Sequence, residues 1–180
     1  MQKKIYKVIS NYGRINLYKK ETLDFVLEDI SMNIKKAEKG DLSEILDLQY
    51  LAYQSEARLF DNQNIPPLKQ TLTDVEKEYQ KGIILKALDK DKTIIGSVRA
   101  FCENETVYIG KLMVHPSKQG QGIGTQLLLE MEKQYPKQRY ELFTSTRSEK
   151  NIALYKKLGY KVFDERQVTG ELRFVYMEKI

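Results

Sequence analysis

The sequence has few of the residues from which covalent cross-links and metal sites are built. Its 180 residues include one cysteine, one histidine and no tryptophan. A single thiol excludes an intramolecular disulfide, and one cysteine with one histidine leaves the common zinc sites short of ligands. Any metal would have to be held by carboxylates alone, so we expect no metal centre.

Long apolar runs are also absent. A membrane-spanning helix needs about 20 consecutive apolar residues, and the leucine-rich segment after Thr125 is interrupted by Glu130 and Glu132. The N-terminus carries lysines but neither a continuous apolar core nor a small-residue cleavage site, so no secretory signal is evident. We therefore expect a cytoplasmic protein without a membrane partner.

Positive charge is in modest excess and is concentrated near the N-terminus. Thirty Lys and Arg face 25 Asp and Glu, a formal net charge of +5. Six basic residues and no acidic one fall within residues 1–20, which leaves 24 basic against 25 acidic side chains in the rest. We treat residues 1–31 as a basic N-terminal extension, either docked, mobile or upstream of a start at Met32, and residues 32–180 as one domain. Nucleic acid is not an expected partner of that domain.

Capping and turn residues divide residues 32–180 into elements. Capping boxes are expected at 41–44 and 73–76, each at the start of a helix. The two prolines within residues 64–67 are expected to stop any helix there, because proline lacks an amide hydrogen. Gly82 is expected to end the second helix.

Three runs rich in β-branched residues follow and predict an antiparallel meander. They cover residues 83–88, 93–101 and 106–114. The remaining expected elements are a helix ending near residue 134, a strand at 139–145, a helix at 148–158 that Ser148 caps, and strands at 160–166 and 171–178. The sequence thus predicts an α/β (α+β) domain.

A glycine-rich turn between a predicted strand and a predicted helix is the most informative segment. Gly120, Gly122 and Gly124 alternate in it. Glycine has no Cβ to keep a ligand from the backbone, and the first turn of a helix offers unpaired amides and the positive end of the helix dipole. The turn therefore predicts a phosphate or pyrophosphate site, with tight packing against a sheet as the alternative. Its spacing fits neither a Walker loop nor a Rossmann fingerprint.

Residues 119–124 resemble the Gln/Arg-x-x-Gly-x-Gly/Ala signature of the GCN5-related N-acetyltransferases (GNAT), which hold the pyrophosphate of acetyl-CoA with it. Val114-His115-Pro116 is similar to the Val-x-Pro that precedes this signature, and residues 151–160 have the family's Asn-x-x-x-Tyr-x-x-x-Gly-Tyr spacing. The resemblance covers residues 32–180. It implies a mixed, mostly antiparallel central sheet of six to seven strands flanked by about four helices, with acetyl-CoA as cosubstrate and an amine as acceptor.

The resemblance also implies roles for individual residues. Tyr155 is the expected acid at the sulfur, and Asn151, one turn earlier on the same helix face, is expected to bond the pantetheine arm. The Met113 or Val114 amide is expected to polarise the carbonyl. The alternatives are a helix-capping Asn151 and a core Tyr155. The expected coenzyme-binding residues are Leu112, Met113, Val114, Gln119, Gly120, Gln121, Gly122, Ile123, Gly124, Thr125, Asn151 and Tyr155.

The general base stays open at this stage. Tyr108 occupies the strand position at which some family members carry a glutamate, and Cys102 is not an expected nucleophile because the amine attacks directly. The remaining candidates for the base are Glu56, Glu103, Glu105 and His115. Acceptor recognition is expected from Tyr50, Tyr53, Glu56, Phe60 and residues 61–67, where carboxylates and aromatic faces can receive a cation, with ordinary surface residues as the alternative.

These observations predict an acetyl-CoA-dependent N-acetyltransferase acting on a primary amine of a small molecule or a peptide. The alternative is a non-catalytic acetyl-CoA-binding sensor or partner module. A third interpretation, a nucleic-acid binder that uses the basic N-terminus, predicts binding with a steep salt dependence. A homodimer is one oligomeric state compatible with the sequence.

Overall fold

The computed structural model describes residues 5–9, 15–19, 33–170 and 172–180. It divides the chain into two compact units, residues 1–33 and residues 34–180. In the first unit β1 (Ile5–Ile9) and β2 (Ile15–Lys19) form an antiparallel pair. The alternative start at Met32 lies outside the described residues.

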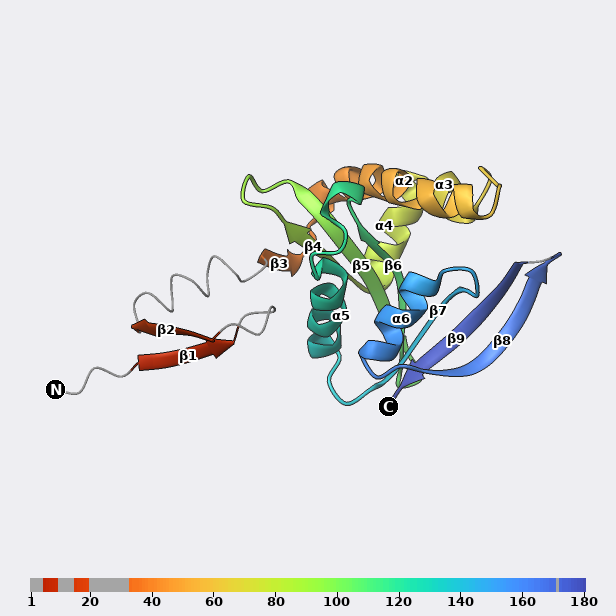
Figure 1. The fold of residues 1–180 in the computed structure, drawn as a ribbon. Helices are drawn as coiled ribbons and strands as arrows, with labels where there is room; N and C mark the ends of the chain where they lie inside the picture. The colour runs from red at the N-terminus through yellow and green to blue at the C-terminus, as the bar shows by residue number, and fades with distance from the viewer. Residues whose placement is uncertain (1–4, 10–14, 20–32, 171) are drawn as a thin grey trace. The chain divides into compact units, whose positions relative to one another are not determined.

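The second unit is built on a seven-stranded sheet with the strand order β3-β4-β5-β6-β7-β9-β8 (Figure 1). The pair of β6 and β7 is parallel, while β4/β5, β5/β6, β7/β9 and β8/β9 are antiparallel. This confirms the expected mixed, mostly antiparallel sheet. The strands are β3 (Asn33–Lys36), β4 (Ile83–Leu88), β5 (Ile94–Glu103), β6 (Thr106–Val114), β7 (Arg139–Ser145), β8 (Lys161–Thr169) and β9 (Leu172–Lys179).

Five α-helices are found among the described residues, one more than the four expected. They are α2 (Leu42–Leu59), α3 (Pro66–Lys69), α4 (Leu72–Lys81), α5 (Ile123–Gln134) and α6 (Glu149–Lys157), with 3-10 turns η1 (Lys39–Asp41) and η2 (Pro116–Lys118). The additional helix is α3, which begins at the two prolines that were expected to stop a helix. Proline fits the first turn because the amide it lacks has no intrahelical partner there.

Two of the expected capping interactions are wrong. Thr71 and Asp74, rather than Thr73 and Glu76, form the capping box of α4, because the same pattern also occurs two residues earlier. Asp41 stands at the N-cap of α2 without a side-chain cap bond. Its carboxylate instead accepts hydrogen bonds from the Glu38 amide and from Lys86.

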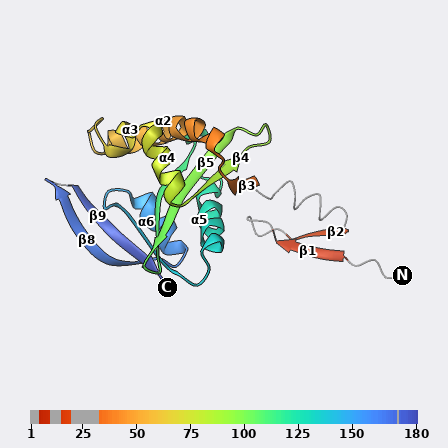
Figure 2. The same cartoon turned by 180° about the vertical axis from the view of Figure 1, so that it is seen from behind.

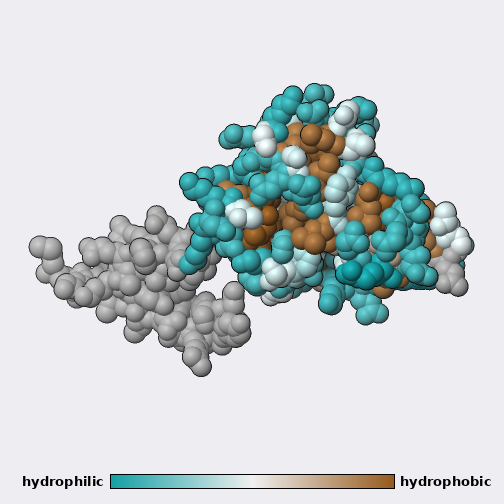
Figure 3. All heavy atoms as spheres, turned by 90° about the horizontal axis from the view of Figure 1, so that it is seen from above, coloured by the Kyte–Doolittle hydropathy of each residue, from teal (hydrophilic) through white to brown (hydrophobic). Residues whose placement is uncertain are grey.

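The helices pack on both faces of the sheet, with α5 and α6 on one face and α4 on the other (Figures 1 and 2). Ile45 and Leu48 of α2 and Val75 of α4 form one buried cluster with strand residues that include Ile84 and Met113. Seen from above, the surface is mainly hydrophilic with apolar patches (Figure 3). None of the helices in the described residues combines the length and the apolar character needed to span a membrane.

Strand β6 departs from regular pairing on both of its sides. Against β7 it pairs at three positions only, from Thr106 to Tyr108. Against β5, Gly110 pairs with Arg99 and Met113 pairs with Ser97, so two residues of β6 face one residue of β5. This β-bulge contains Lys111, whose φ of 52° is rare for a residue with a side chain. The bulge therefore follows shortly after Tyr108, the last residue of β6 that pairs with β7.

Candidate active site

A cavity of about 760 Å³ is bounded by α2, the end of β6, the turn before α5 and the start of α6. Of the twelve expected coenzyme-binding residues, all but Gln121 and Tyr155 line it. The ten lining residues are Leu112, Met113, Val114, Gln119, Gly120, Gly122, Ile123, Gly124, Thr125 and Asn151. Gln121 is exposed, and Tyr155 is buried with 6% of its surface exposed.

The glycine turn has the backbone conformation that glycine allows. Gly120 and Gly122 have φ values of +77° and +84°, in the left-handed region, and Gly122 is the N-cap of α5. The Gln119 side-chain amide donates to the Val114 carbonyl at 3.3 Å. Hydrogen bonding of the helix begins with the Gln126 amide, which donates to the Gly122 carbonyl at 3.1 Å. The preceding amides of the first turn are the groups that an anion can bind.

Basic side chains surround this turn. Lys118, Arg147, Lys150 and Lys157 all line the cavity. The Lys118 amine is 2.6 Å from an Asp89 carboxylate oxygen, which fixes its position. Glu149 also lines the cavity, and the Lys118 charge is paired with Asp89, so cationic side chains outnumber acidic ones at this end and favour a ligand with several phosphates.

The start of α6 places two polar side chains at the cavity. Asn151 Nδ2 is 3.5 Å from Thr144 Oγ1 on β7. Ser148 stands at the N-cap as expected, but its hydroxyl makes no cap hydrogen bond. Its Oγ is buried and has no hydrogen-bond partner among the described residues. Ser148 lines the cavity, but its Oγ is covered in the structure, so its hydroxyl would reach a ligand only after the side chain rotates.

Tyr155 packs inside the domain, with its ring 6.1 Å from that of Tyr160. Burial raises the pKa of the Tyr155 phenol, and the carboxylate of Glu56 raises it further. The phenol therefore stays protonated at neutral pH, while the raised pKa makes it a weaker acid than an exposed tyrosine. The electrostatic effect of Glu56 also links Tyr155 to the cavity, because Glu56 lines it.

Glu56 is the one candidate base that the cavity contains. Burial raises its pKa, and the ammonium group of Lys111 opposes that shift. The other glutamates, Glu103 and Glu105, are exposed, and Glu105 lines a separate pocket. His115 Nδ1 is 2.8 Å from Ser117 Oγ, in the loop after β6.

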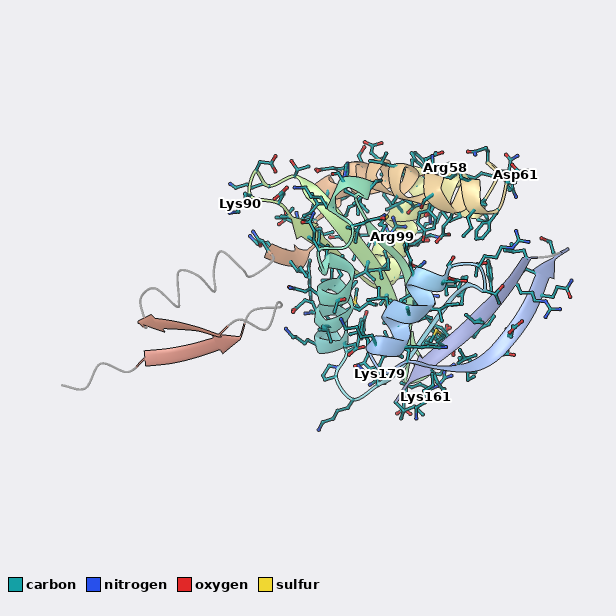
Figure 4. All side chains as sticks on the ribbon, in the orientation of Figure 1. Arg58, Asp61, Lys90, Arg99, Lys161 and Lys179 are labelled. Atoms are coloured by element: carbon teal, nitrogen blue, oxygen red, sulfur yellow. The ribbon has the colours of Figure 1, made fainter. Side chains whose placement is uncertain are left out.

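Some of the residues that were expected to recognise the acceptor line the cavity and others do not. Tyr53 lines the cavity with Glu56, three residues away on the same face of α2. Tyr50 does not line it, because its hydroxyl donates to the Gln70 carbonyl. Phe60 and residues 61–67 do not line it either, and Figure 4 places Asp61 at the outer end of α2. Cys102 is exposed on β5.

A buried polar network supports α2 from beneath and was missed in the sequence. Arg99 of β5 is 5% exposed and lies inside the domain (Figure 4). Its guanidinium donates to Glu78 of α4, to Gln70 at 3.2 Å and to Gln49 of α2 at 2.8 Å. Gln49 also donates to the Pro67 carbonyl at 2.7 Å. Gln49, a glutamine on the apolar face of α2, is the feature of the sequence that could have indicated a buried polar network. It does not identify Arg99 or the other members of that network.

Lys111 brings a positive charge close to Glu56 and Tyr53. Its amine lies 6.0 Å from the centroid of the Tyr53 ring. Burial lowers the pKa of this amine, while the carboxylates of Glu78 and Glu56 oppose the shift. Tyr53 and Glu56 thus line one end of the cavity with the Lys111 amine close to the Tyr53 ring.

Comparisons with known proteins give the family and the fold to which the chain is similar. Residues 52–180 match the family model described as an acetyltransferase (GNAT) domain. An uncharacterised N-acetyltransferase, ycf52, of Gracilaria tenuistipitata var. liui is 25% identical over 122 residues, which are 62% of this chain. The chain spans 66% of the length of that relative.

Solved structures share the fold. The ribosomal-protein-S18-alanine N-acetyltransferase of Escherichia coli has a TM-score of 0.67 at 16% identity, over 82% of this chain and 92% of that one. The PaiA N-acetyltransferase of Thermoplasma acidophilum, solved in complex with coenzyme A, has a TM-score of 0.64 at 19% identity, over 83% and 99%.

Proposed function

Because this chain belongs to the GNAT acetyltransferase family, we propose that it is an N-acetyltransferase that moves the acetyl group of acetyl-CoA directly to a primary amine of a small molecule or a peptide. The observation that carries the proposal is the cavity in which the glycine turn and Glu56 meet, with the Tyr155 phenol coupled electrostatically to Glu56. One end has the groups for a phosphate-bearing coenzyme, the other has the Glu56 carboxylate, and the Tyr155 phenol is buried behind the cavity wall.

The residues of the cavity fit acetyl-CoA. The first-turn amides of α5 and the lysines beside them would hold the phosphates. The unpartnered Ser148 hydroxyl, the Asn151 side chain and the backbone of residues 112–114 would hold the amide groups of the pantetheine arm. The coenzyme supplies a thioester whose carbonyl carbon is open to attack by an amine.

Two side chains of the protein move protons in this proposal. Glu56 takes a proton from the acceptor amine, since an ammonium group is not nucleophilic, and its raised pKa brings it nearer to neutral pH. Tyr155 donates a proton to the departing sulfur. The Met113 or Val114 amide would donate to the carbonyl oxygen as negative charge develops on it.

A non-catalytic coenzyme sensor is the competing function. It requires the same coenzyme end but has no need of the Glu56 and Tyr155 pair, whose presence favours an enzyme. The deciding experiment measures free thiol release from acetyl-CoA with a panel of amines, together with coenzyme binding by calorimetry. Release of thiol that depends on an amine is expected. Tight coenzyme binding without thiol release would overturn catalysis and leave the sensor.

The role of Glu56 has its own test. We expect Glu56→Gln to lower kcat by about 100-fold, the lower end of the range for general-base catalysis. Glu103→Gln is the matched control, because Glu103 is exposed and outside the cavity. Equal kcat values for the two variants would remove Glu56 from the mechanism.

We also propose that residues 32–180 form the domain that carries the activity and that residues 1–31 are an extension. The match to the family model, residues 52–180, lies within this range. We place the protein in the cytoplasm.

A further inference from the structure

We propose that Lys111 is an internal acetyl acceptor, so that the protein acetylates the ε-amine of its own Lys111. The inference rests on the proposed acetyl transfer and names one substrate of that same site. It deepens the proposed function because the acceptor is part of the chain.

The Lys111 amine lies near Tyr53 at the edge of the cavity, although Lys111 is not itself one of the residues that line it. In a regular strand the side chain would alternate with its neighbours, but Lys111 lies in the bulge of β6 with φ at 52°. A bulge re-aims the side chain it contains. The Lys111 amine stands 6.0 Å from the centroid of the Tyr53 ring. Tyr53 and Leu112, the residue after Lys111, both line the cavity.

Charged groups from three elements face the Lys111 amine. They are Glu56 of α2, Glu78 of α4 and Arg99 of β5. Glu78 is already bonded to the Arg99 guanidinium, which leaves Glu56 as the carboxylate able to take a proton. The half-buried position lowers the pKa of the Lys111 amine, so more of it is uncharged than at an exposed lysine.

The transfer balances with groups already assigned. The uncharged Lys111 Nζ attacks the acetyl carbon, an N–C bond forms and the C–S bond of the thioester breaks. The proton lost by Nζ goes to Glu56, and the thiolate that leaves takes the proton of Tyr155. Glu56 then returns its proton to the Tyr155 phenolate, with which it is electrostatically coupled. The products are acetyl-Lys111 and free coenzyme A.

The experiment incubates the full chain with acetyl-CoA and no added amine, and then locates acetyl groups by peptide mass mapping. We expect Lys111 to be acetylated at least about tenfold faster than Lys77, an exposed lysine of α4. The first-order rate constant should not change when the protein is diluted, because donor and acceptor sites are on one molecule. Glu56→Gln should slow the modification by about 100-fold.

Matched variants and a measurement without coenzyme complete the test. Lys111→Arg keeps the charge and should abolish the acetylated peptide, while Lys77→Arg should leave the Lys111 peptide unchanged. Competitive labelling of the coenzyme-free protein with acetic anhydride should give Lys111 a lower pKa than Lys77.

The outcomes separate this inference from the proposed function. If Lys111 stays unmodified in protein that acetylates an amine of the panel, the inference is wrong and the function stands. If Lys111 reacts no faster than Lys77, or equally fast in Glu56→Gln, the modification is chemical rather than catalysed and the inference is again wrong. If no thioester is cleaved with either acceptor, both fail.

Discussion

The two ends of the cavity are built in different ways. The proposed coenzyme end is lined by two segments, within residues 112–125 and 147–157, and the groups proposed to bind the phosphates are backbone amides. The proposed acceptor end is lined by side chains of α2, including Glu56, and is backed by charged side chains of α4, β5 and β6, including Arg99 and Lys111. Backbone recognition depends on where glycines stand, so it leaves a local pattern in the sequence. A side-chain cluster drawn from four elements leaves none.

The largest effect is expected at the coenzyme end, from Gly122→Glu. The substitution places a carboxylate where the phosphates are proposed to bind, at a residue with φ of +84°. We expect coenzyme affinity to fall by on the order of 1,000-fold, about 4 kcal/mol, measured by calorimetry.

Gly122→Ala is the control for this substitution. It also has the strain of the left-handed conformation, about 1–2 kcal/mol, but adds no charge, and a Cβ here meets nothing within 4 Å. Equal affinities in the two variants would show that the turn does not face an anion.

Breaking the network under the acceptor end should mainly lower stability. Arg99→Ala leaves the partly solvated Glu78 carboxylate, 39% exposed, without its partner and leaves the buried Gln49 amide oxygen without its Arg99 donor, and an unsatisfied buried polar group costs about 1–3 kcal/mol. The measurement is the free energy of unfolding in urea. Arg173→Ala, which breaks an exposed pair with Glu165, should cost only about 0–1 kcal/mol. Similar losses would mean that α2 is not supported by this network.

The same difference explains which predictions from the sequence were correct. The strands at 83–88, 106–114 and 139–145 match β4, β6 and β7, because β-branched runs between turn residues specify their own boundaries. The glycine turn before α5 could be identified for the same local reason. The partners of Arg99 could not, because its three partners stand 21 to 50 residues away in the chain and meet only in the folded domain. Asp41 and Ser148 failed as caps because capping patterns do not tell whether another partner or a ligand competes for the side chain.

The next effect falls on the proposed acid. Tyr155→Phe removes one proton donor and keeps the buried ring, so we expect kcat to fall by about 100-fold. Coenzyme affinity should stay within a few-fold of the parent protein. Tyr108→Phe is the control, since that ring stacks on Phe101 and lies outside the cavity. An unchanged kcat in Tyr155→Phe would exclude the phenol as the acid.

A smaller effect, on pH dependence, should link Lys111 to Glu56. The Lys111 ammonium lowers the pKa of Glu56, so Lys111→Met should raise it. A base must be deprotonated to act, so the acid limb of the pH profile of kcat/KM, measured with an external amine, should move to higher pH. Lys111→Arg keeps the charge and should leave the limb in place. Movement toward lower pH would contradict Glu56 as the base.

The smallest effect tests whether Ser148 belongs to the helix or to the coenzyme. A hydroxyl that caps α6 would stabilise the fold, and Ser148→Ala would then cost about 0.5–2 kcal/mol of unfolding free energy. In the structure this hydroxyl makes no cap bond and is buried without a partner among the residues that the structure describes. We therefore expect no loss of stability, and a coenzyme affinity weaker by about 0.5–1.5 kcal/mol, the net value of one hydrogen bond. Calorimetry and urea unfolding on the same variant separate the two roles. Lost stability with unchanged coenzyme affinity would show that Ser148 caps α6 and does not bind the coenzyme.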